Sequence, residues 1–526
     1  FLNSSLAYEQ AQQVERELTS GELVLLYAAP ERVAMPRFLA QLDALYQRGR
    51  LGLFAIDEAH CVSQWGHDFR ADYLQLDVLH QRFPKVPRIA LTATADKQTQ
   101  ADIIARLKLE EARVFLSSFD RPNIRYTIVE KDNARSQLLR FIKEEHAGEA
   151  GIVYCQSRKK VEETAAWLQK EGIASLPYHA GLEANARRDH QDRFIREEGL
   201  VMAATIAFGM GIDKPDVRFV AHLDLPKTIE SYYQETGRAG RDGQPADAWM
   251  AYGLSDVVNQ RRMIDEGQGG EEFKRSQRQK LDALLALAEA HTCRRVRLLA
   301  YFDETSGPCG NCDNCLSPPL TWDATQAAQK VLSCVYRFYQ QAQGRFGVGH
   351  LVDVLRGKET EKVVDYRHQL LTTFGVGKDM SEGEWRSLIR QLIAGGHISA
   401  EGEFSTLSFT ASSWAVLKGE QKLELRKPSE GRRARGKSTR GKSTREPSLP
   451  LDARGHACFS ALKDWRAGVA REHNLPAYVV FHDATLIEMA RMRPATLAEL
   501  GGVSGVGAKK LHAYGPEILR VLKEVA

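Results

Sequence analysis

The sequence predicts an α/β protein with two parallel sheets in series, followed by a cysteine-rich module and mainly helical domains. In about the first half of the chain, short apolar runs alternate with helical stretches, which is the pattern of parallel sheets flanked by helices. Four cysteines then fall close together. Beyond them, amphipathic stretches carry helix start and stop signals.

Length and composition point to a soluble protein with several domains. The chain has 526 residues, of which 43% are hydrophobic and 27% charged. No window approaches the ~18 apolar residues of a membrane span, and the amino end has no basic stretch leading into an apolar core. Eight cysteines in a chain of this size do not indicate a secreted disulfide scaffold. We therefore expect a cytoplasmic protein.

The first predicted buried strand is the apolar run Leu51 to Ile56 in "LGLFAIDEAH". Ligands of open α/β sheets bind at the carboxyl ends of the strands, and this strand ends in two carboxylates and a histidine. Asp57 is a candidate ligand of Mg2+ that bridges nucleotide phosphates, Glu58 a candidate to polarise an attacking water, and His60 a candidate relay to neighbouring loops. The alternative is that the acidic loop only caps a helix.

Further strands and loops follow in order. A second apolar run ends in "LTATA" (91–95), which would place the hydroxyls of Thr92 and Thr94 beside the acidic pair. Segments beginning at Gly151, Tyr178 and Val201 then predict a second parallel sheet.

The segment "SYYQETGRAGRDG" carries two arginines three residues apart. If the segment opens a helix, Arg238 and Arg241 share a face, and a planar guanidinium can neutralise charge on a transferring phosphoryl group. We expect Arg241 to be an arginine finger that reaches across a cleft, supported by Arg238 and Gln234. The alternative is a surface ion-pair cluster.

Directly after the acidic box, "HCVSQWGHDFR" is rich in aromatic side chains. Unpaired bases stack on aromatic faces, and a cation can hold the backbone. The candidate DNA-binding and coupling residues are Gln64, Trp65, Phe69 and Arg70. The alternative is that the aromatic rings only pack between domains.

The cysteine cluster has the spacing C-x15-C-x2-C-x2-C. Such short separations allow four thiolates to converge at ~2.3 Å from one Zn2+, and four protein ligands make a closed, structural site. The predicted ligands are Cys293, Cys309, Cys312 and Cys315, and the alternative is four unrelated buried thiols. The remaining cysteines (Cys61, Cys155, Cys334 and Cys458) are predicted to be small packing residues.

Past this module, "SEGEWRSLIRQLIAGGHI" predicts an amphipathic helix that starts at a capping box of Ser381 and Glu384 and ends at Gly395. Arg386 and Arg390 flank its apolar face and either contact DNA or solvate the helix. The alternating "HISAEGEFSTLSFT" predicts a hairpin, so the segment fits a winged helix and its wing.

A basic segment follows, in which residues 421–446 hold ten Lys or Arg against three Asp or Glu. It matches the phosphate-loop pattern G-x-x-x-x-G-K-[ST] twice, at 431–438 and 436–443. A working phosphate loop lies between a buried strand and a helix, and no strand is predicted before Gly431. We interpret the segment as a disordered linker that either contacts nucleic acid nonspecifically or has no partner.

The last predicted domain, residues 451–526, is all-helical. Tyr478 is a candidate for stacking on single-stranded DNA and is equally suited to a core position. Lys509 and Lys510 follow a glycine turn and are candidates to contact phosphate.

The motifs "DEAH", "TATA" and "QETGRAGRDG", with "HCVSQWGHDFRADY" after the acidic box, resemble the RecQ DNA helicases of helicase superfamily 2 over essentially the whole chain. The resemblance implies two RecA-like lobes that close on ATP with Mg2+, a zinc-binding module, a winged helix and an HRDC domain. It also implies 3′ to 5′ translocation on single-stranded DNA and unwinding of partly duplex DNA in recombination and repair, at the nucleoid. Single-strand-binding protein is a candidate partner, and no membrane is involved.

The resemblance suggests these domain ranges: 1–117 for lobe one, 118–255 for lobe two, 256–320 for the zinc module, 321–420 for the winged helix, 421–449 for the linker and 450–526 for the HRDC domain.

The chain departs from this family at its front. Family members carry an adenine-reading glutamine segment and a true phosphate loop well before "YAAPER" (27–32), so we expect lobe one to be incomplete in these residues. Two readings remain: an ATP-driven helicase whose amino end is missing here, so that these residues alone need not hydrolyse ATP, or a noncatalytic, zinc-stabilised DNA-binding protein.

Overall fold

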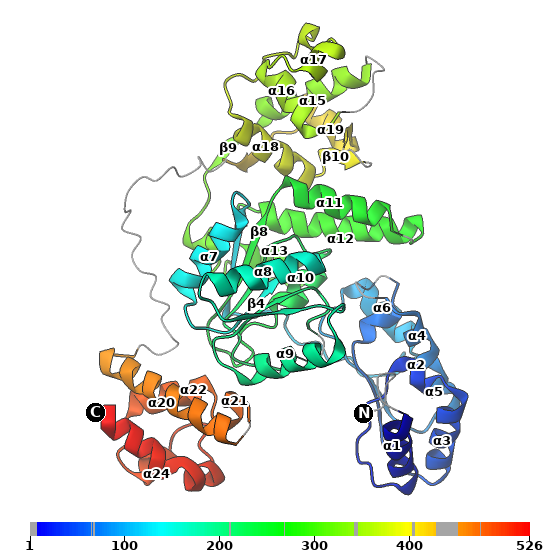
Figure 1. Cartoon of the computed structure of the whole chain (residues 1–526). Coiled ribbons are helices and arrows are strands. Elements are labelled where there is room, and N and C mark those ends of the chain that lie inside the picture. Colours follow the sequence, from blue (N-terminus) through cyan, green and yellow to red (C-terminus); the bar gives the residue numbers. More distant parts are fainter. Residues whose placement is uncertain are drawn as a thin grey trace.

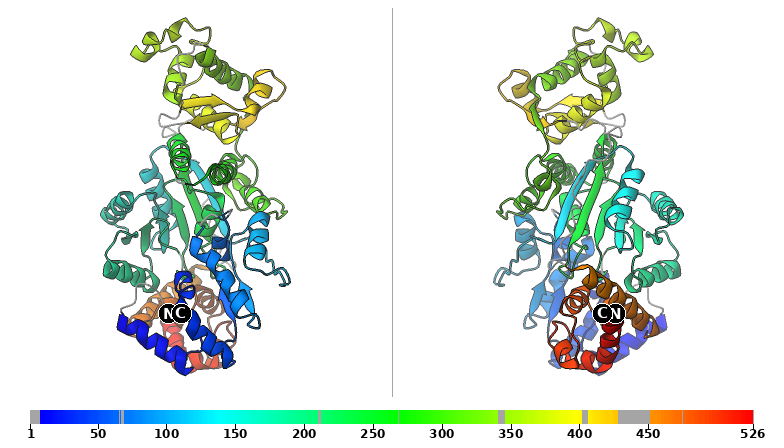
Figure 2. Two further views of the ribbon diagram at one scale, coloured as in Figure 1. Left: turned by 90° about the vertical axis from the view of Figure 1, so that its right-hand side faces the viewer. Right: turned by 90° about the vertical axis from the view of Figure 1, so that its left-hand side faces the viewer.

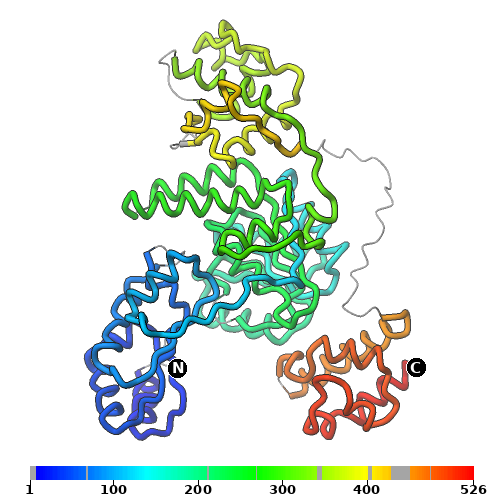
Figure 3. The backbone as a smooth tube through the Cα atoms, turned by 180° about the vertical axis from the view of Figure 1, so that it is seen from behind, coloured from blue at the N-terminus to red at the C-terminus, as the bar shows by residue number. Residues whose placement is uncertain are grey.

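The computed structural model describes residues 8–64, 66, 69–209, 212–267, 269–340, 346–401, 406–427, 451–473 and 475–525. The molecule is elongated, with a winged helix at one end and a large parallel sheet in the middle (Figures 1 and 2). At the other end, lobe one and the C-terminal helical domain lie on opposite sides of this sheet domain (Figure 3).

Within its described residues, lobe one has a two-stranded parallel sheet, in which Phe54 pairs with Arg88 and Ile56 with Ala90. Its apolar core lies between this sheet and the helices. The first strand is shorter than predicted, because Leu53 is exposed and only Ile56 is buried. The elements are α1 (Tyr8–Ser20), α2 (Pro30–Val33), α3 (Pro36–Gln47), β1 (Phe54–Ile56), η1 (Ala59–Val62), α4 (Ala71–Leu74), η2 (Gln75–Asp77), α5 (Val78–Arg82), β2 (Arg88–Ala90) and α6 (Lys97–Arg106).

Lobe two has a six-stranded sheet in the order β3-β8-β7-β4-β6-β5, with every pair parallel. This is the second parallel sheet that the alternating pattern predicted. Its elements are β3 (Ile124–Glu130), α7 (Ala134–Glu145), β4 (Gly151–Tyr154), α8 (Arg158–Lys170), β5 (Ser175–Tyr178), α9 (Ala184–Arg196), β6 (Val201–Ala204), β7 (Phe219–His222), α10 (Ile229–Thr236) and β8 (Ala246–Tyr252).

The strands of lobe two are apolar throughout because both faces of the sheet are covered. Along β4, Ile152 and Tyr154 face a core shared with the zinc module, whereas Val153 packs with α7 and α8 on the other side. Successive residues of a strand point to opposite faces, so each must be apolar here.

A single hydrophobic core runs from lobe two through the cysteine module into the winged helix. The cysteine module has α11 (Leu254–Asp265), α12 (Glu271–Glu289), α13 (Arg294–Tyr301) and α14 (Asp313–Leu316). The winged helix has β9 (Thr321–Asp323), α15 (Thr325–Gln340), α16 (Val348–Arg356), α17 (Glu361–Asp365), η3 (His368–Leu370), α18 (Glu382–Ala394), β10 (Ile398–Glu401), β11 (Thr406–Phe409), α19 (Ala411–Leu417) and β12 (Glu424–Arg426).

Two local predictions in the winged helix are confirmed. The Ser381 hydroxyl accepts from the Glu384 N–H while the Glu384 carboxylate accepts from the Ser381 N–H, which makes the predicted capping box of α18. The predicted hairpin is the antiparallel pair of β10 and β11.

The basic segment begins later than predicted. Residues 424–426 form β12, which pairs antiparallel with β9, so the winged helix continues past 421. This pairing joins residues about a hundred positions apart, and the local composition gave no sign of it. Both matches to the phosphate-loop pattern lie outside the described residues.

The C-terminal domain is helical, as predicted, and has a core of its own. Its elements are α20 (Ala453–Glu472), α21 (Ala477–Val480), α22 (Asp483–Met492), α23 (Leu497–Gly501) and α24 (Ala508–Val525). Among the helices that the structure describes, none is both long and apolar enough to cross a membrane.

Candidate functional site

The acidic pair lies at the carboxyl end of β1, where the sheet edge meets the short helix η1. Glu58 has φ 49°, in the left-handed region, which costs a non-glycine residue of order 1–3 kcal/mol. The turn is held from both sides, because the Ala59 N–H donates to the Leu91 carbonyl (2.9 Å) and the Leu91 N–H donates to the Ile56 carbonyl (2.9 Å). The fold thus presents the Asp57 and Glu58 side chains at the strand end predicted for phosphate and metal chemistry.

His60 connects the two strand ends. Its ring is buried, and Nδ1 lies 2.9 Å from the Thr92 hydroxyl and 3.4 Å from a carboxylate oxygen of Glu58. The same Thr92 oxygen accepts from the Thr94 N–H at 3.3 Å. Among the described residues, the buried Thr94 hydroxyl has no hydrogen-bond partner. The structure therefore brings together the acidic pair, the histidine and the two predicted threonines.

The loop after the acidic box is tied to η1, which carries His60. The Arg70 N–H donates to the Cys61 carbonyl at 2.9 Å and closes the loop. Gly66 lies so close that an added Cβ would be 2.4 Å from the His60 carbonyl oxygen. Gln64 is exposed, Phe69 and Arg70 are half-buried, and Trp65 lies outside the described residues.

Tyr73 was missed by the sequence reasoning. Its hydroxyl donates to the Asp57 carbonyl at 3.2 Å, so α4 contacts the acidic box directly. Burial, followed by the nearby Cys61, raises the pKa of Tyr73 to about 12, which keeps the phenol a donor at neutral pH. The only sequence signal was an aromatic residue three positions after Arg70.

The predicted shared helix face of the two lobe-two arginines is wrong. Helix α10 ends at Thr236 with Gly237 as its C-cap, and Gly240 has φ 57°. Arg238 and Arg241 thus lie on the turn that follows the helix, because glycine ends helices readily and reaches the left-handed region at little cost.

The two guanidinium groups bind residues 205–209 and 212–216 of their own lobe. Arg238 is 7% exposed and donates to the Gly209 carbonyl, and a Cβ on Gly209 would lie 2.2 Å from its Nη2. Arg241 is more exposed and donates to the Ile212 carbonyl (2.8 Å) and to the Asp213 carboxylate (3.3 Å). Of the two, Arg241 has the weaker anchorage and is better able to move.

Helix α10, which carries Gln234, is anchored by buried polar contacts at both ends. Glu235 lies 2.7 Å from the buried His222 of β7. Glu230 pairs with Lys280 of α12 and accepts from the Tyr301 hydroxyl of α13 at 2.6 Å. The half-buried Gln234 therefore lies on a helix that contacts both the sheet and the cysteine module.

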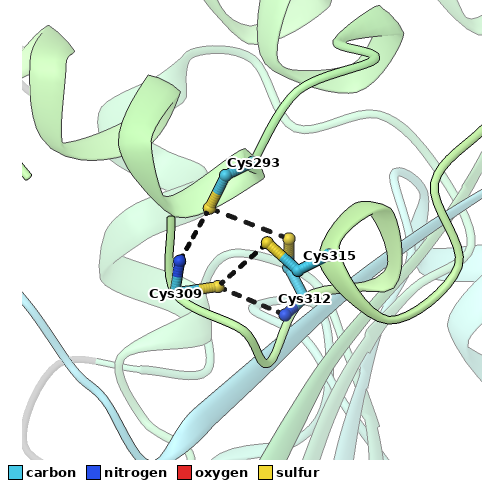
Figure 4. Close-up of side chains that lie close together, drawn as sticks. All are labelled: Cys293, Cys309, Cys312 and Cys315. Carbon is cyan, nitrogen blue, oxygen red and sulfur yellow. Dashed lines mark hydrogen bonds between the residues drawn. The ribbon is translucent and has the colours of Figure 1, made fainter. Parts of the chain in front are cut away.

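The four predicted zinc ligands converge, with all Sγ atoms within 4.8 Å of one another (Figure 4). Two Sγ pairs are 3.9 and 4.0 Å apart, close to the ~3.8 Å edge of a tetrahedron with Zn–S bonds of ~2.3 Å. Backbone N–H groups of Cys309, Cys312 and Arg294 point at the sulfurs at 3.2–3.4 Å, as suits thiolates. Burial alone would raise the pKa of Cys293, but such backbone donors lower it to about 7. The donor set fits one structural zinc ion.

The other four cysteines are all buried, as predicted for packing residues.

The cysteine module is joined to lobe two through Asp313, which lies between two of the ligands. Its carboxylate accepts two bonds from the Arg294 guanidinium (2.7 and 2.9 Å) and one from the Ile128 N–H of β3 (3.0 Å). Asp313 and Arg294 therefore stabilise the contact between the module and the sheet.

The two arginines of α18 differ sharply. Arg390 is 6% exposed and pairs with Glu130 of lobe two and Glu289 of α12, so its guanidinium does not face DNA in this structure. Arg386 is exposed and pairs with Glu382 one turn earlier at 3.0 Å. Only Arg386 remains placed to contact phosphate.

Tyr478 is half-buried, and its hydroxyl donates to the Asp213 carbonyl of lobe two at 3.1 Å. Lys510 donates to the Val479 carbonyl at 3.0 Å and lies 5.0 Å from the centre of the Phe481 ring. Both residues are thus used in protein contacts here, whereas Lys509 is exposed.

Four family models match consecutive parts of the chain. They are the helicase conserved C-terminal domain (131–243), RecQ zinc-binding (254–316), the RQC domain (318–434) and the HRDC domain (455–522).

Three bacterial proteins, each named "ATP-dependent DNA helicase RecQ", are similar over the full 526 residues. The protein of Pasteurella multocida is 44% identical over 100% of this chain and 81% of its own length. That of Haemophilus influenzae is 43% identical over 100% of this chain and 83% of its own. That of Bacillus subtilis is 34% identical over 100% of this chain and 85% of its own.

Proposed function

The chain belongs to the RecQ helicase family, and we propose that it is an ATP-dependent DNA helicase that translocates 3′ to 5′ on single-stranded DNA and unwinds duplexes in recombination and repair. The observation that carries the proposal is the acidic pair at the end of β1, with His60 hydrogen-bonded to Thr92 of the neighbouring strand end. A protein that only bound DNA would have no use for this arrangement.

In the proposed reaction Asp57 would hold Mg2+, which would neutralise charge on the phosphates of ATP, and Glu58 would orient and polarise the attacking water. His60 transmits the phosphate state to Thr92 and Thr94 through its ring. On lobe two, Arg241 leaves Asp213 and reaches the transferring phosphoryl group, while Arg238 and Gln234 hold the turn and the helix in place. Loss of hydrolysis without loss of folding is the expected signature of each catalytic residue.

We expect the effect of DNA binding to be transmitted to the acidic box through the loop of Gln64, Trp65, Phe69 and Arg70. Two hydrogen bonds support this route. The Arg70 N–H closes the loop onto η1, and the Tyr73 hydroxyl, just after the loop, donates to the Asp57 carbonyl. Bases that stack on this loop would shift α4 and η1 together, and with them Glu58 and His60. Arg386 is the proposed phosphate contact of the winged helix.

The cysteine module holds a zinc ion that closes the tetrahedron of thiolates and has a structural role. Single-strand-binding protein as a partner, a location at the nucleoid and the domain limits given above, apart from the start of the linker at 421, stay predictions.

A direct test is ATP hydrolysis by the protein expressed from its complete gene, with and without single-stranded DNA. Glu58→Gln keeps the size of the side chain but removes its charge, so we expect turnover to fall by about 100-fold or more with DNA affinity retained. The matched control is Glu111→Gln, an exposed acid of lobe one. Unchanged turnover in Glu58→Gln would remove Glu58 from the catalytic role.

The second reading, a noncatalytic zinc-stabilised DNA-binding protein, is not favoured by the identity to helicases over the whole chain.

A further inference from the structure

The HRDC domain contacts lobe two through a buried arginine. Arg466 of α20 is 1% exposed and donates to the Phe481 carbonyl (2.7 Å) within its own domain. Its guanidinium also pairs with Asp483 (2.7 Å) and, across the domain boundary, with Glu198 just after α9 (2.7 Å). Lys463, one turn earlier on α20, lies 3.7 Å from the same Glu198 carboxylate. Two cations of the HRDC domain therefore converge on one acid of lobe two.

The HRDC domain makes a second contact with lobe two, at the loop that binds Arg241. The Tyr478 hydroxyl donates to the Asp213 carbonyl, and the Asp213 carboxylate accepts from Arg241. One residue of lobe two is thus bonded to the HRDC domain through its backbone and to the proposed arginine finger through its side chain.

Lys214 joins these two contacts into one surface. Its side chain is buried, and Nζ donates to the Glu197 carbonyl (3.2 Å) and pairs with Asp216 (3.2 Å). The loop that contains Asp213 is therefore fixed to the chain that leads into Glu198. Because Lys214 is buried and bonded on both sides, the loop and the end of α9 move together.

We propose that Glu198 and the loop of Asp213 and Lys214 form a docking site for the HRDC domain of the same chain, and that docking slows ATP turnover by keeping Arg241 on its own lobe. In the docked state Tyr478 is engaged with Asp213, so it does not bind DNA at the same time. Single-stranded DNA that captures Tyr478 releases the domain, and the loop of Asp213 then lets Arg241 cross to the nucleotide. The effect on turnover rests on the proposed function, whereas the docking site does not.

The docked state is expected to be reversible. The pair of Lys463 with Glu198 is partly exposed, so it contributes little and is screened by salt. The Arg466 guanidinium is buried, but it keeps Asp483 of its own domain as a partner, so undocking does not leave it without a counter-ion. A tethered domain, however, has an effective concentration in the millimolar range, so weak contacts suffice to keep it docked at low salt.

The test uses the protein expressed from its complete gene with Glu198→Lys, which faces Lys463 and Arg466 with a like charge. The matched control is Glu197→Lys, since the side chain of this neighbouring acid pairs with Arg193 of its own helix. Tyr478→Phe removes only the hydroxyl and serves as a second, milder variant. Small-angle X-ray scattering at low salt measures the radius of gyration, and ATP turnover is measured without DNA.

We expect Glu198→Lys to raise the radius of gyration and to raise DNA-free turnover about fivefold, and high salt to expand the wild-type chain in the same way. Glu197→Lys should match the wild type in both. A Glu198→Lys chain as compact as the wild type would overturn the docking site. An expanded chain with unchanged turnover would contradict the proposal that docking restrains Arg241. Absence of turnover in every form would contradict the proposed function, while the scattering data would still decide the docking site.

Discussion

Glu58 occupies a left-handed backbone position that few side chains adopt, and two backbone hydrogen bonds around Leu91 hold it there. Strain of this kind persists only where the surrounding structure enforces it, and it clusters at functional positions. Here it turns the carboxylate toward His60. At the scale of single residues, the chemistry of lobe one therefore depends on the neighbouring strand as much as on the acidic box itself.

Arg241 is the residue through which lobe two is expected to act on the nucleotide. Arg241→Ala removes a partly exposed guanidinium that binds Ile212 and Asp213, so folding should be preserved while turnover falls about 10³-fold. Arg238→Ala should also lower turnover, but it removes a buried side chain and one of the two donors to the Gly209 carbonyl, so it should lower the melting temperature too. Steady-state kinetics and thermal unfolding of both variants separate the two roles. Wild-type turnover in Arg241→Ala would assign the finger to another residue.

At the scale of elements, helix α18 is fixed to lobe two and α12 by Arg390. Removing one partner of a buried ion pair costs about 3–5 kcal/mol, because the remaining charges are left in a poorly solvated place. Arg390→Ala leaves Glu130 and Glu289 without their cation and should lower the melting temperature clearly. Arg386→Ala, on the same helix, breaks only an exposed pair and should change stability by less than about 1 kcal/mol.

DNA binding provides the complementary readout for these two variants. Arg386→Ala should weaken binding to a tailed duplex modestly and reduce its salt dependence, since one phosphate contact is lost. Equal stability loss in both variants would contradict the assigned burial of Arg390.

The zinc module is the other element whose removal has a predictable result. Cys312→Ser takes one ligand from a closed site at the edge of the core shared with lobe two, and metal binding here supplies folding free energy. We expect less than one zinc per chain by atomic absorption, with lower soluble yield. Cys458→Ala, in the core of the HRDC domain, should keep its zinc. A normally folded, metal-free Cys312→Ser protein would refute the assignment.

Predictions from sequence succeeded where the signal is local. The capping box of α18 involves residues three positions apart, and the zinc ligands fall within 23 residues, so spacing alone was informative. Arg390 and Tyr478 could not be placed in this way, because their partners Glu289 and Asp213 lie 101 and 265 positions away. The helical face expected for Arg238 and Arg241 failed for another reason, since Gly237 ends α10 before the arginines.

At the scale of the whole molecule, the described residues form four hydrophobic clusters, one of which lies only on the α7 and α8 face of the lobe-two sheet. Lobe one and the HRDC domain each have a core of their own, whereas lobe two, the zinc module and the winged helix share one. Among the described residues, lobe one contacts this central body through an exposed ion pair of Lys97 with Asp303 (3.5 Å). We expect this light contact to let the lobes close on a nucleotide, and we expect the shared core to carry that motion to the winged helix.

The central claim is that this arrangement is a DNA-unwinding motor. The most direct measurement is strand separation by the protein from its complete gene, with ATP and Mg2+, on duplexes that carry either a 3′ or a 5′ single-stranded tail. We predict unwinding of the 3′-tailed duplex, little of the 5′-tailed one, and none by Glu58→Gln. Binding of both duplexes without unwinding of either would contradict the account and leave a DNA-binding protein in its place.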